Sequence, residues 1–301
     1  MKQLTSEEQL EKAIQWTKQY LPRSIMGYNW LMVNPATSNS MCYVDQWPNP
    51  KIMAGVNFFE HYGIKEYPQF CFFTCLSKED KDNVENFLMQ LSDEIGVSEV
   101  GGVECGAIDS DWVESFLKVF ADNLSLNASV GVWPNRMCYM SKEQRDALVM
   151  KNIQPPPGYK FDTIRAEESE LVDSMWPHRT PGSEKLMKRR IMNFPSVCLR
   201  EITENGERKL ASFELMHDML GMTHHLYTLP EFRRRGLATM VEEKLCQKMI
   251  KQGYIPCKTV IRGNIEAEKI TEASPWWTYV CDVSWFRFAN EAMNKLYGVH
   301  Q

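Results

Sequence analysis

The chain has 301 residues, of which 44% are hydrophobic and 24% are charged. These values are typical of a soluble globular protein with a substantial core, and the length suggests two domains. The formal net charge is -5, so the chain as a whole is not expected to bind nucleic acid, and any anion site must be local. No stretch reaches the roughly 20 consecutive apolar residues that a membrane-spanning helix requires.

The N-terminal segment and the cysteines indicate an intracellular protein, in the cytoplasm or the mitochondrion. Residues 1–20 contain three glutamates and three lysines and are helix-patterned, unlike a secretory signal or an arginine-rich transit peptide. Nine cysteines are scattered along the chain without a C-x-x-C pair. This spacing predicts reduced thiols and no metal site.

The first half of the chain alternates between helical and strand-like patterns. Thr5 and Glu8 form a capping box that predicts a helix as far as Pro22. Strands are expected at 30–33, 41–44, 52–56, 70–76 and 136–140, with helices from Ser77 and over 110–124. PPPG at 155–158 is a stiff break, which predicts domains at 1–154 and 155–301.

The second half follows the order of a mixed sheet. Its predicted elements are a strand at 161–166, a helix-loop-helix over 167–193, strands at 196–202, 209–217 and 221–228, a helix at 237–251, a strand at 255–261 and a helix from Asn264. This order predicts an α/β fold with helices on both faces of a sheet.

The turn between residues 228 and 237 has the composition of an anion site. Arg233, Arg234 and Arg235 precede Gly236, where a helix is expected to begin. The first N–H groups of a helix lack intrahelical partners and carry partial positive charge, and glycine allows close approach of a ligand. The turn therefore predicts a pyrophosphate cradle, although it lacks the patterns of a nucleotide P-loop and of a dinucleotide fold.

The pattern R-x-x-G-x-A at 233–238 resembles the acyl-CoA pyrophosphate loop of the GNAT acyltransferase superfamily. VDQWP at 44–48, RMCYM at 136–140, the stretch 171–199 and TLPEFR at 228–233 resemble the glycine N-acyltransferase family, in the order of that family. The resemblance implies a GNAT-type mixed sheet flanked by helices in the second half. It also implies an α/β N-terminal domain, for which a degenerate GNAT-like half is one form.

The implied reaction moves an acyl group from acyl-CoA to the amino group of glycine or a similar small amino acid, directly in a ternary complex and without a metal. The implied coenzyme A contacts are Leu226, Tyr227 and Thr228 along the pantetheine arm, Arg233, Arg234, Arg235, Gly236, Leu237, Ala238 and Thr239 at the phosphates, and Asn264 near the pantetheine. A backbone N–H of the strand before the cradle is expected to stabilise the oxyanion.

The sequence departs from the family at the expected general base. The family's glutamate corresponds here to Met222, which cannot accept a proton. His224 is the expected substitute, with His225 as the fallback, because an imidazole titrates near neutral pH. The alternative is that both are ordinary strand histidines and that the reaction is slow or proceeds through water.

The resemblance also implies roles outside the coenzyme A contacts and the general base. Tyr297 is a candidate proton donor to the leaving thiolate, and Arg179 is a candidate partner for the acceptor carboxylate. The basic run Lys188–Arg190 is expected to form a solvated helix face or to meet the 3′-phosphate of coenzyme A. Two further functions stay open: acylation of a peptide or protein, and acyl-CoA binding with weak catalysis.

Overall fold

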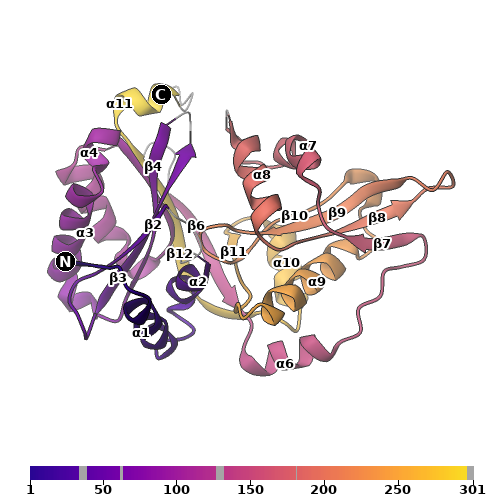
Figure 1. The fold of residues 1–301 in the computed structure, drawn as a ribbon, viewed down its shortest axis with the longest axis horizontal. Helices are drawn as coiled ribbons and strands as arrows, with labels where there is room; N and C mark the ends of the chain where they lie inside the picture. Colours follow the sequence, from indigo (N-terminus) through magenta and orange to yellow (C-terminus); the bar gives the residue numbers. More distant parts are fainter. Residues whose placement is uncertain (34–38, 62–63, 127–131, 181, 297–301) are drawn as a thin grey trace. The chain divides into compact units, whose positions relative to one another are not determined.

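The computed structural model describes residues 1–33, 39–61, 64–126, 132–180 and 182–296 (Figure 1). The chain forms two compact units. The first contains residues 1–139, 259–274 and 279–301, and the second contains residues 140–258 and 275–278. The units are therefore not consecutive halves such as 1–154 and 155–301, and the PPPG stretch lies inside the second unit.

The eight-stranded sheet has the order β1-β2-β3-β4-β5-β12-β6-β11. Its strands are β1 (Lys2–Leu4), β2 (Ser40–Val44), β3 (Ile52–His61), β4 (Ile64–Thr74), β5 (Gly102–Asp109), β6 (Val132–Tyr139), β11 (Cys257–Ile261) and β12 (Thr278–Ala289). β12 runs antiparallel to β5, from Val283 opposite Asp109 to Ala289 opposite Gly102. A strand from the end of the chain thus lies inside a sheet built mainly from its beginning.

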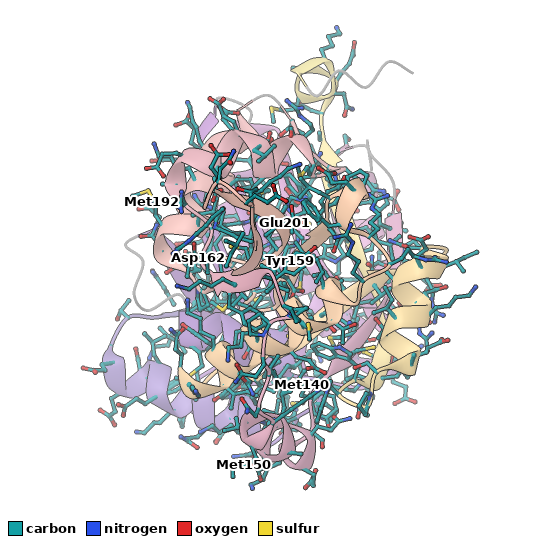
Figure 2. All side chains as sticks on the ribbon, turned by 90° about the vertical axis from the view of Figure 1, so that its right-hand side faces the viewer. Met140, Met150, Tyr159, Asp162, Met192 and Glu201 are labelled. Carbon is teal, nitrogen blue, oxygen red and sulfur yellow. The ribbon has the colours of Figure 1, made fainter. Side chains whose placement is uncertain are left out.

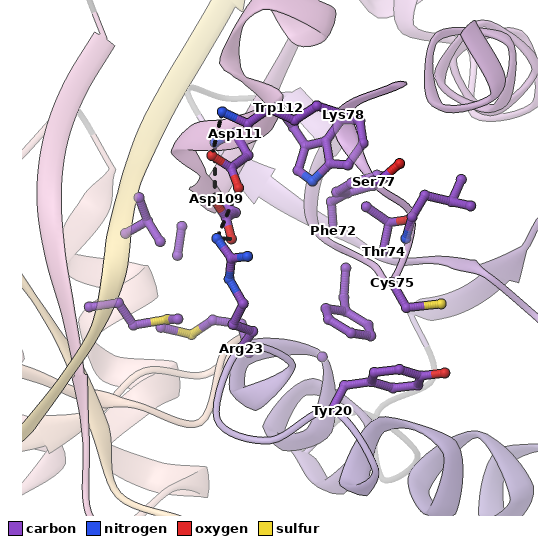
Figure 3. A pocket seen from close by; sticks show the side chains of 17 residues that line it. Tyr20, Arg23, Phe72, Thr74, Cys75, Ser77, Lys78, Asp109, Asp111 and Trp112 are labelled. Carbon is purple, nitrogen blue, oxygen red and sulfur yellow. Dashed lines mark hydrogen bonds and ion pairs between the residues drawn. The ribbon is translucent and has the colours of Figure 1, made fainter. Parts of the chain in front are cut away.

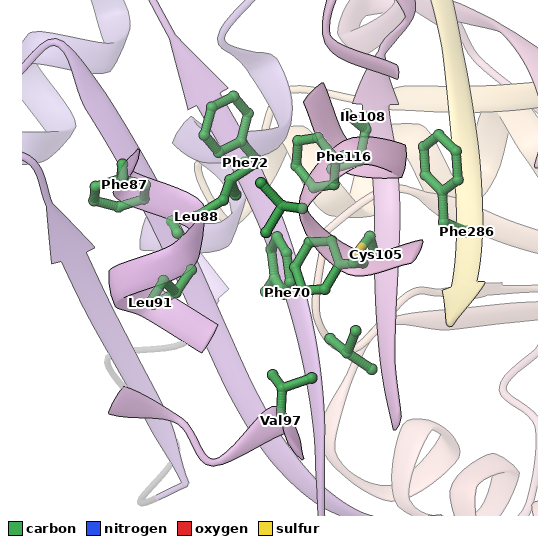
Figure 4. Close-up of a cluster of buried hydrophobic side chains, with 14 of the residues drawn as sticks. Phe70, Phe72, Phe87, Leu88, Leu91, Val97, Cys105, Ile108, Phe116 and Phe286 are labelled. Atoms are coloured by element: carbon green, nitrogen blue, oxygen red, sulfur yellow. The ribbon is translucent and has the colours of Figure 1, made fainter. Parts of the chain in front are cut away.

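Helices cover both faces of this sheet in the first unit. One face packs on α3 (Lys81–Glu94) and α5 (Val113–Phe116) through a phenylalanine-rich core around Phe70, Phe116 and Phe286 (Figure 4). Three short helical segments adjoin it: Ser110–Trp112, the π-helical Leu117–Asn123 and α4 (Val97–Val100). α1 (Glu7–Lys18) contacts α2 (Ile25–Val33), which packs on β3 and β4.

Two expectations for the N-terminal region are wrong. Residues 30–33 belong to α2 rather than to a strand, since nearly all of this helix is buried and its apolar run lacks a period that separates helix from strand. The capping box of α1 uses Ser6 and Gln9, one residue after the predicted pair. Ser6 accepts the backbone N–H of Gln9, and the Gln9 side chain accepts that of Ser6.

The second unit contains an antiparallel sheet with the order β10-β9-β8-β7. Its strands are β7 (Tyr159–Asp162), β8 (Ser196–Ile202), β9 (Arg208–Met216) and β10 (Thr223–Thr228). β7 and β8 pair Tyr159 with Glu201 and Asp162 with Cys198; Figure 2 labels Tyr159, Asp162 and Glu201. These strands follow the predicted order, with β8 at the predicted limits.

Helices lie on both faces of the second sheet as well. α9 (Leu237–Lys251) contacts β8, β9 and β10, whereas residues of α7 (Ser169–Ser174) and α8 (Ser183–Asn193) form a core with Phe213 and Leu215 of β9. α6 (Lys142–Met150) is held to α9 by Gln247, whose side-chain amide donates to the carbonyls of Leu148 and Lys151.

Two further α-helices, α10 (Ile265–Ala273) and α11 (Glu291–Leu296), belong to the first unit. In the described part of the chain, no helix is long and apolar enough to cross a membrane.

A buried arginine joins β7, β8 and the turn that leads into α7. Arg200 is 1% exposed and donates from Nε to Asp162 Oδ2 at 2.9 Å. Its two terminal amino groups donate to the Glu168 carboxylate at 2.6 and 2.7 Å, and the carbonyl of Thr163 accepts a further bond. Removal of one partner from a buried ion pair is costly because the remaining charges lose their compensation.

We expect Arg200→Leu to lower the free energy of unfolding of the second unit by about 3 kcal/mol, because two carboxylates would lose their cation. The exposed Arg208→Leu on the neighbouring strand is the matched control and should change it by less than about 0.5 kcal/mol. Guanidinium unfolding followed by tryptophan fluorescence measures both. Equal effects of the two substitutions would show that the Arg200 network does not stabilise the fold.

Candidate acyl-CoA site

The site begins on β10, an edge strand of the four-stranded sheet. β10 pairs with β9 through Thr223, His224, Tyr227 and Thr228, with an irregularity between His224 and Tyr227. From His224 to Tyr227 the β10 chain advances three residues, whereas β9 advances two, from Leu215 to Phe213. His225 has a left-handed φ of 56°. This is a β-bulge, which leaves a residue outside the ladder and redirects the strand. The bulge falls on the predicted pantetheine-lining stretch.

The backbone between β10 and α9 contains two left-handed residues, Arg234 with φ 63° and Gly236 with φ 73°. Gly236 is the N-cap of α9 and offers no side chain to the first N–H groups. A Cβ atom added at Gly236 would meet nothing within 4 Å, so open space adjoins the helix start. The first turn of α9 also contains no acidic residue. These features leave the partial positive charge of the helix start available to an anion.

The three arginines of this turn are exposed but differ in how they are held. Arg233 donates from Nε to the carbonyl of Thr228 at 3.0 Å, and Arg235 donates to the Tyr159 hydroxyl at 2.7 Å and to the carbonyl of Glu231 at 3.1 Å. Within the described residues, Arg234 makes no hydrogen bond or ion pair. Two arginines thus brace the turn, and the third is available to a ligand.

Phe232 fixes the turn to the second unit. Its side chain is 2% exposed, and it lies edge-on to the Tyr159 ring at 6.4 Å between ring centroids. The Arg235 guanidinium lies over the Phe232 ring at 5.6 Å. Because one aromatic side chain is buried on the inner side, the arginines remain on the outer side of the same turn.

His224 lies in a cluster of rings on the face that α7 and α8 cover. Its ring centroid is 5.0 Å from that of His217 and 5.8 Å from that of Trp176. Removal from water and then the Arg190 guanidinium hold the pKa of His224 well below its usual value. Its Nε2 atom is buried and has no hydrogen-bond partner within the described structure. The neutral ring therefore has an unsatisfied nitrogen.

Arg190 is the charged centre of this cluster. It is 3% exposed and donates from Nε to Asp218 Oδ1 at 2.8 Å. Its Nη2 atom lies 3.2 Å from His217 Nε2. Its Nη1 group is buried and has no partner among the described residues. Arg189 also contacts Asp218. The expectation of a solvated basic face or a 3′-phosphate contact is thus wrong for Arg189 and Arg190, because the Asp218 carboxylate draws both guanidinium groups inward.

His225, the fallback base, is held differently from His224. It sits in the bulge with its ring edge-on to Phe213 at 5.1 Å. Burial lowers the pKa of His225 to about 4, although the nearby backbone of Met175 opposes the shift.

Met222 is 2% exposed, and its carbonyl accepts the backbone N–H of His217. The side chain of Met222 therefore has a packing role in the fold.

The other predicted site residues lie in different surroundings. Leu237 is buried, Ala238 is partly exposed and Thr239 is exposed in the first turn of α9. The side chain of Arg179 is 60% exposed, with Nε 3.8 Å from Asp173 Oδ2. Asn264 belongs to the first unit and caps α10 by accepting the N–H of Ala267. Tyr297 lies outside the described residues, and the described residues contain no cluster of metal ligands.

The lowered pKa of His217 gives a pH dependence of stability. Burial, followed by Arg190, lowers the pKa of His217 from 6.5 to about 3. Between these values the unfolded chain binds a proton that the folded chain does not, so stability falls as the pH falls through this window. We expect His217→Asn to flatten the pH dependence of unfolding free energy below pH 6.5 by up to about 1.4 kcal/mol per pH unit. Identical slopes in denaturant titrations from pH 7 to 4.5 would contradict this account.

Similar sequences cover most of the chain. A family model described as FR47-like protein matches residues 202–273. Glycine N-acyltransferase of Mus musculus is 24% identical over 289 residues, covering 88% of this chain and 90% of that protein. Glycine N-acyltransferase of Rattus norvegicus is 26% identical over 284 residues, with the same coverage of both chains. These similarities support acyl transfer as the class of reaction.

Similar solved structures agree on the fold. An X-ray structure of a Drosophila protein has a TM-score of 0.73 at 15% identity, covering 96% of this chain and 98% of that chain. A tandem GNAT protein from the clavulanic acid biosynthesis pathway has a TM-score of 0.54 at 10% identity, covering 96% of each chain. The chain thus resembles the glycine N-acyltransferases over most of its length, and its fold is that of the GNAT acyltransferases, as its motifs predict.

Proposed function

We propose that this protein is an acyl-CoA-dependent N-acyltransferase whose acceptor is glycine or a similar small amino acid. The observation that carries the proposal is the turn from bulged β10 into α9, with its arginines and left-handed Gly236. The similarity of the chain to glycine N-acyltransferases over most of its length also supports this function.

Coenzyme A would be held mainly by its phosphates. Arg234 and the first N–H groups of α9, from Leu237 to Thr239, would bind the pyrophosphate, and Arg233 and Arg235 would add positive charge beside it. Leu226, Tyr227 and Thr228 would line the pantetheine arm along the edge of β10. For Asn264 we retain the proposal of a pantetheine contact from the family resemblance.

The acyl group would move directly to the acceptor amine. The amine nitrogen attacks the thioester carbonyl, the new C–N bond forms, and the C–S bond breaks with release of the thiolate. A backbone N–H freed from the ladder by the bulge is a suitable donor to the oxyanion that develops. The amine gives up a proton in this step, and the leaving thiolate takes up a proton.

We assign the proton-accepting role to Nε2 of His224. This nitrogen is unsatisfied, and the lowered pKa keeps the ring neutral near pH 7, so its lone pair is available; the same shift makes the ring a weaker base than an imidazole that titrates near pH 7. His225 also has a lowered pKa and two buried ring nitrogens without a hydrogen-bond partner among the described residues, but it lies within the bulge itself. We therefore retain His225 only as the fallback.

The acceptor carboxylate requires a fixed positive charge. Arg179 is a candidate on the exposed loop before α8, although its guanidinium already lies 3.8 Å from Asp173. Arg190 is a second candidate, because it has a buried, unsatisfied Nη1 group in the cluster that contains His224. A carboxylate bound there would satisfy that donor.

A protein that binds acyl-CoA with weak catalysis is the second candidate function. The specific observation that favours it is Met222, which stands where related enzymes are expected to have glutamate and is buried in the fold. In that case the cradle would bind acyl-CoA without substantial turnover. Acylation of peptides rather than free amino acids is a further outcome that the same assay detects.

We expect purified protein to form an N-acyl amino acid that mass spectrometry detects. The assay offers acetyl-, benzoyl-, medium-chain and long-chain acyl-CoA against glycine, other amino acids and short peptides. Direct product detection is preferable because the nine cysteines would react with a thiol-release dye. Product with peptides alone would favour the protein acceptor, and acyl-CoA binding without any product would favour the weakly catalytic binder.

In the same assay, we expect His224→Gln to lower turnover by about 100-fold, because a general base contributes roughly that much. Affinity for acyl-CoA should stay close to that of the wild type, since the cradle is unchanged. The parallel variant His225→Gln tests the fallback. Wild-type turnover of His224→Gln across pH 6 to 9 would remove His224 from the mechanism.

We expect Gly236→Asp to weaken acyl-CoA binding by about 10- to 100-fold, which corresponds to roughly 1.4 to 2.8 kcal/mol. The added carboxylate would repel phosphate at the helix start. Gly236→Asn is the matched control because asparagine has nearly the same shape, tolerates a left-handed backbone and is neutral. Calorimetry that gives equal losses for the two variants would attribute the effect to strain or shape, and unchanged affinity for Gly236→Asp would overturn the cradle.

A further inference from the structure

The first unit contains a cavity of about 270 Å³ at the carboxyl ends of β4 and β5. These two strands are parallel, and within the described residues their pairing is confined to Gln69 with Glu104 and Phe70 with Cys105. The cavity lies beyond these pairs toward the carboxyl ends of the strands. Residues 72–78, which follow Phe70 on β4, and residues 107, 109, 111 and 112, which follow Cys105 on β5, line it. The strands therefore separate where the cavity lies. In open α/β sheets, such crevices at the carboxyl ends of strands bind ligands.

Four charged side chains, two of each sign, line the cavity. Arg23 Nη2 lies 3.0 Å from Asp109 Oδ2 and 3.0 Å from Asp111 Oδ2. Lys78 Nζ lies 2.8 Å from Asp111 Oδ1. In the view of Figure 3, these side chains form a connected column, with Tyr20 and Cys75 on the other side of the opening. Opposite charges thus stand side by side at the wall of one cavity.

These ion pairs can be exchanged for contacts with a ligand. The side chains of Arg23 and Lys78 are 55% and 68% exposed, and ion pairs at such exposure contribute little to stability. Asp109 is the more deeply placed carboxylate, with 26% of its side chain exposed. Its removal from water raises its pKa despite the opposing effects of the Asp111 backbone N–H and Arg23. An additional cation beside Asp109 would compensate its charge more fully.

The turn after β4 has no net positive charge to attract the phosphates of a nucleotide-like ligand. A helix also follows this strand, but the residues before α3 include Glu79 and Asp80 instead of arginines and glycine. The Ser77 hydroxyl lies 2.8 Å from Glu79 Oε2 and 3.3 Å from Asp80 Oδ2, so this turn presents carboxylates where a pyrophosphate would need donors. The volume of about 270 Å³ also suits a small metabolite better than a coenzyme.

The apolar lining completes the description of the ligand. Aromatic rings of Tyr20, Phe72 and Trp112 and the side chain of Met26 border the same cavity. A matching molecule therefore carries one positive group, one negative group and a compact apolar part.

We propose that this cavity binds a free amino acid with an apolar or aromatic side chain. Its ammonium group would contact Asp109 and Asp111, its carboxylate would contact Arg23 and Lys78, and its side chain would pack on the aromatic wall. The site is built from residues of the first unit and the cradle on α9 from residues of the second, and the proposal does not depend on acyl transfer.

Calorimetry on the full chain with L-phenylalanine, L-leucine and L-methionine tests the proposal. We expect binding of at least one of them, and at least 10-fold weaker binding of its N-acetyl derivative, which lacks the ammonium, and of its amide, which lacks the carboxylate. Asp109→Asn and Lys78→Met should each weaken binding at least 10-fold. Lys81→Met is the matched control, because it removes a neighbouring exposed charge that does not line the cavity.

Thermal unfolding of each variant checks that it folds, and Lys78→Met keeps the test valid if Asp109→Asn does not fold, since Lys78 is exposed. No binding of the three amino acids, or equal binding of the N-acetyl derivative, would overturn the proposal. So would loss of binding in His224→Gln with wild-type binding in Lys78→Met, because the amino acid would then bind in the second unit only.

Discussion

The candidate acyl-CoA site depends on the burial of one side chain, Phe232. The turn between β10 and α9 carries three adjacent arginines, which would repel one another and leave the turn mobile if nothing fixed it. Phe232 anchors the turn from the inside, while Tyr159 accepts from Arg235 and the Thr228 carbonyl accepts from Arg233. The fold thereby concentrates positive charge at the first turn of α9 without an acidic residue to neutralise it there. A net-acidic chain can in this way hold a local anion site.

The two units use the same succession of strand, turn and helix, but the turns differ in charge. In the second unit β10 leads through arginines and glycine into α9, and in the first unit β4 leads through Lys78, Glu79 and Asp80 into α3. Backbone geometry alone therefore does not determine what such a turn binds. In our proposals, the residues at the helix start decide whether the turn binds a polyphosphate, because they set the sign of the potential at the exposed N–H groups.

Elements bounded by local signals could be predicted from the sequence. The limits of β8 and α9 match the predicted 196–202 and 237–251, because the turn at 203–207 ends β8 and glycines flank α9. Local signals could not place β12, whose partners lie far away along the chain, nor identify 30–33 as helix. The cradle was visible as a motif, whereas the burial of Arg190 was not. That burial depends on Asp218 near the start of the β9–β10 connection, which brings a carboxylate to α8.

The position of β12 has a consequence for the order in which the protein folds. β5 and β6 cannot acquire the strand between them until residues 278–289 have been synthesised, by which time the ribosome has made nearly all of the second unit. Such distant pairing is slow because a long loop must close first, and until then unpaired strand edges are open to aggregation. The strands β7 to β10 and α9 are contiguous in sequence and can assemble earlier. The half of the chain that is translated first is thus expected to finish folding last, with its unpaired edges as the natural substrate for a chaperone.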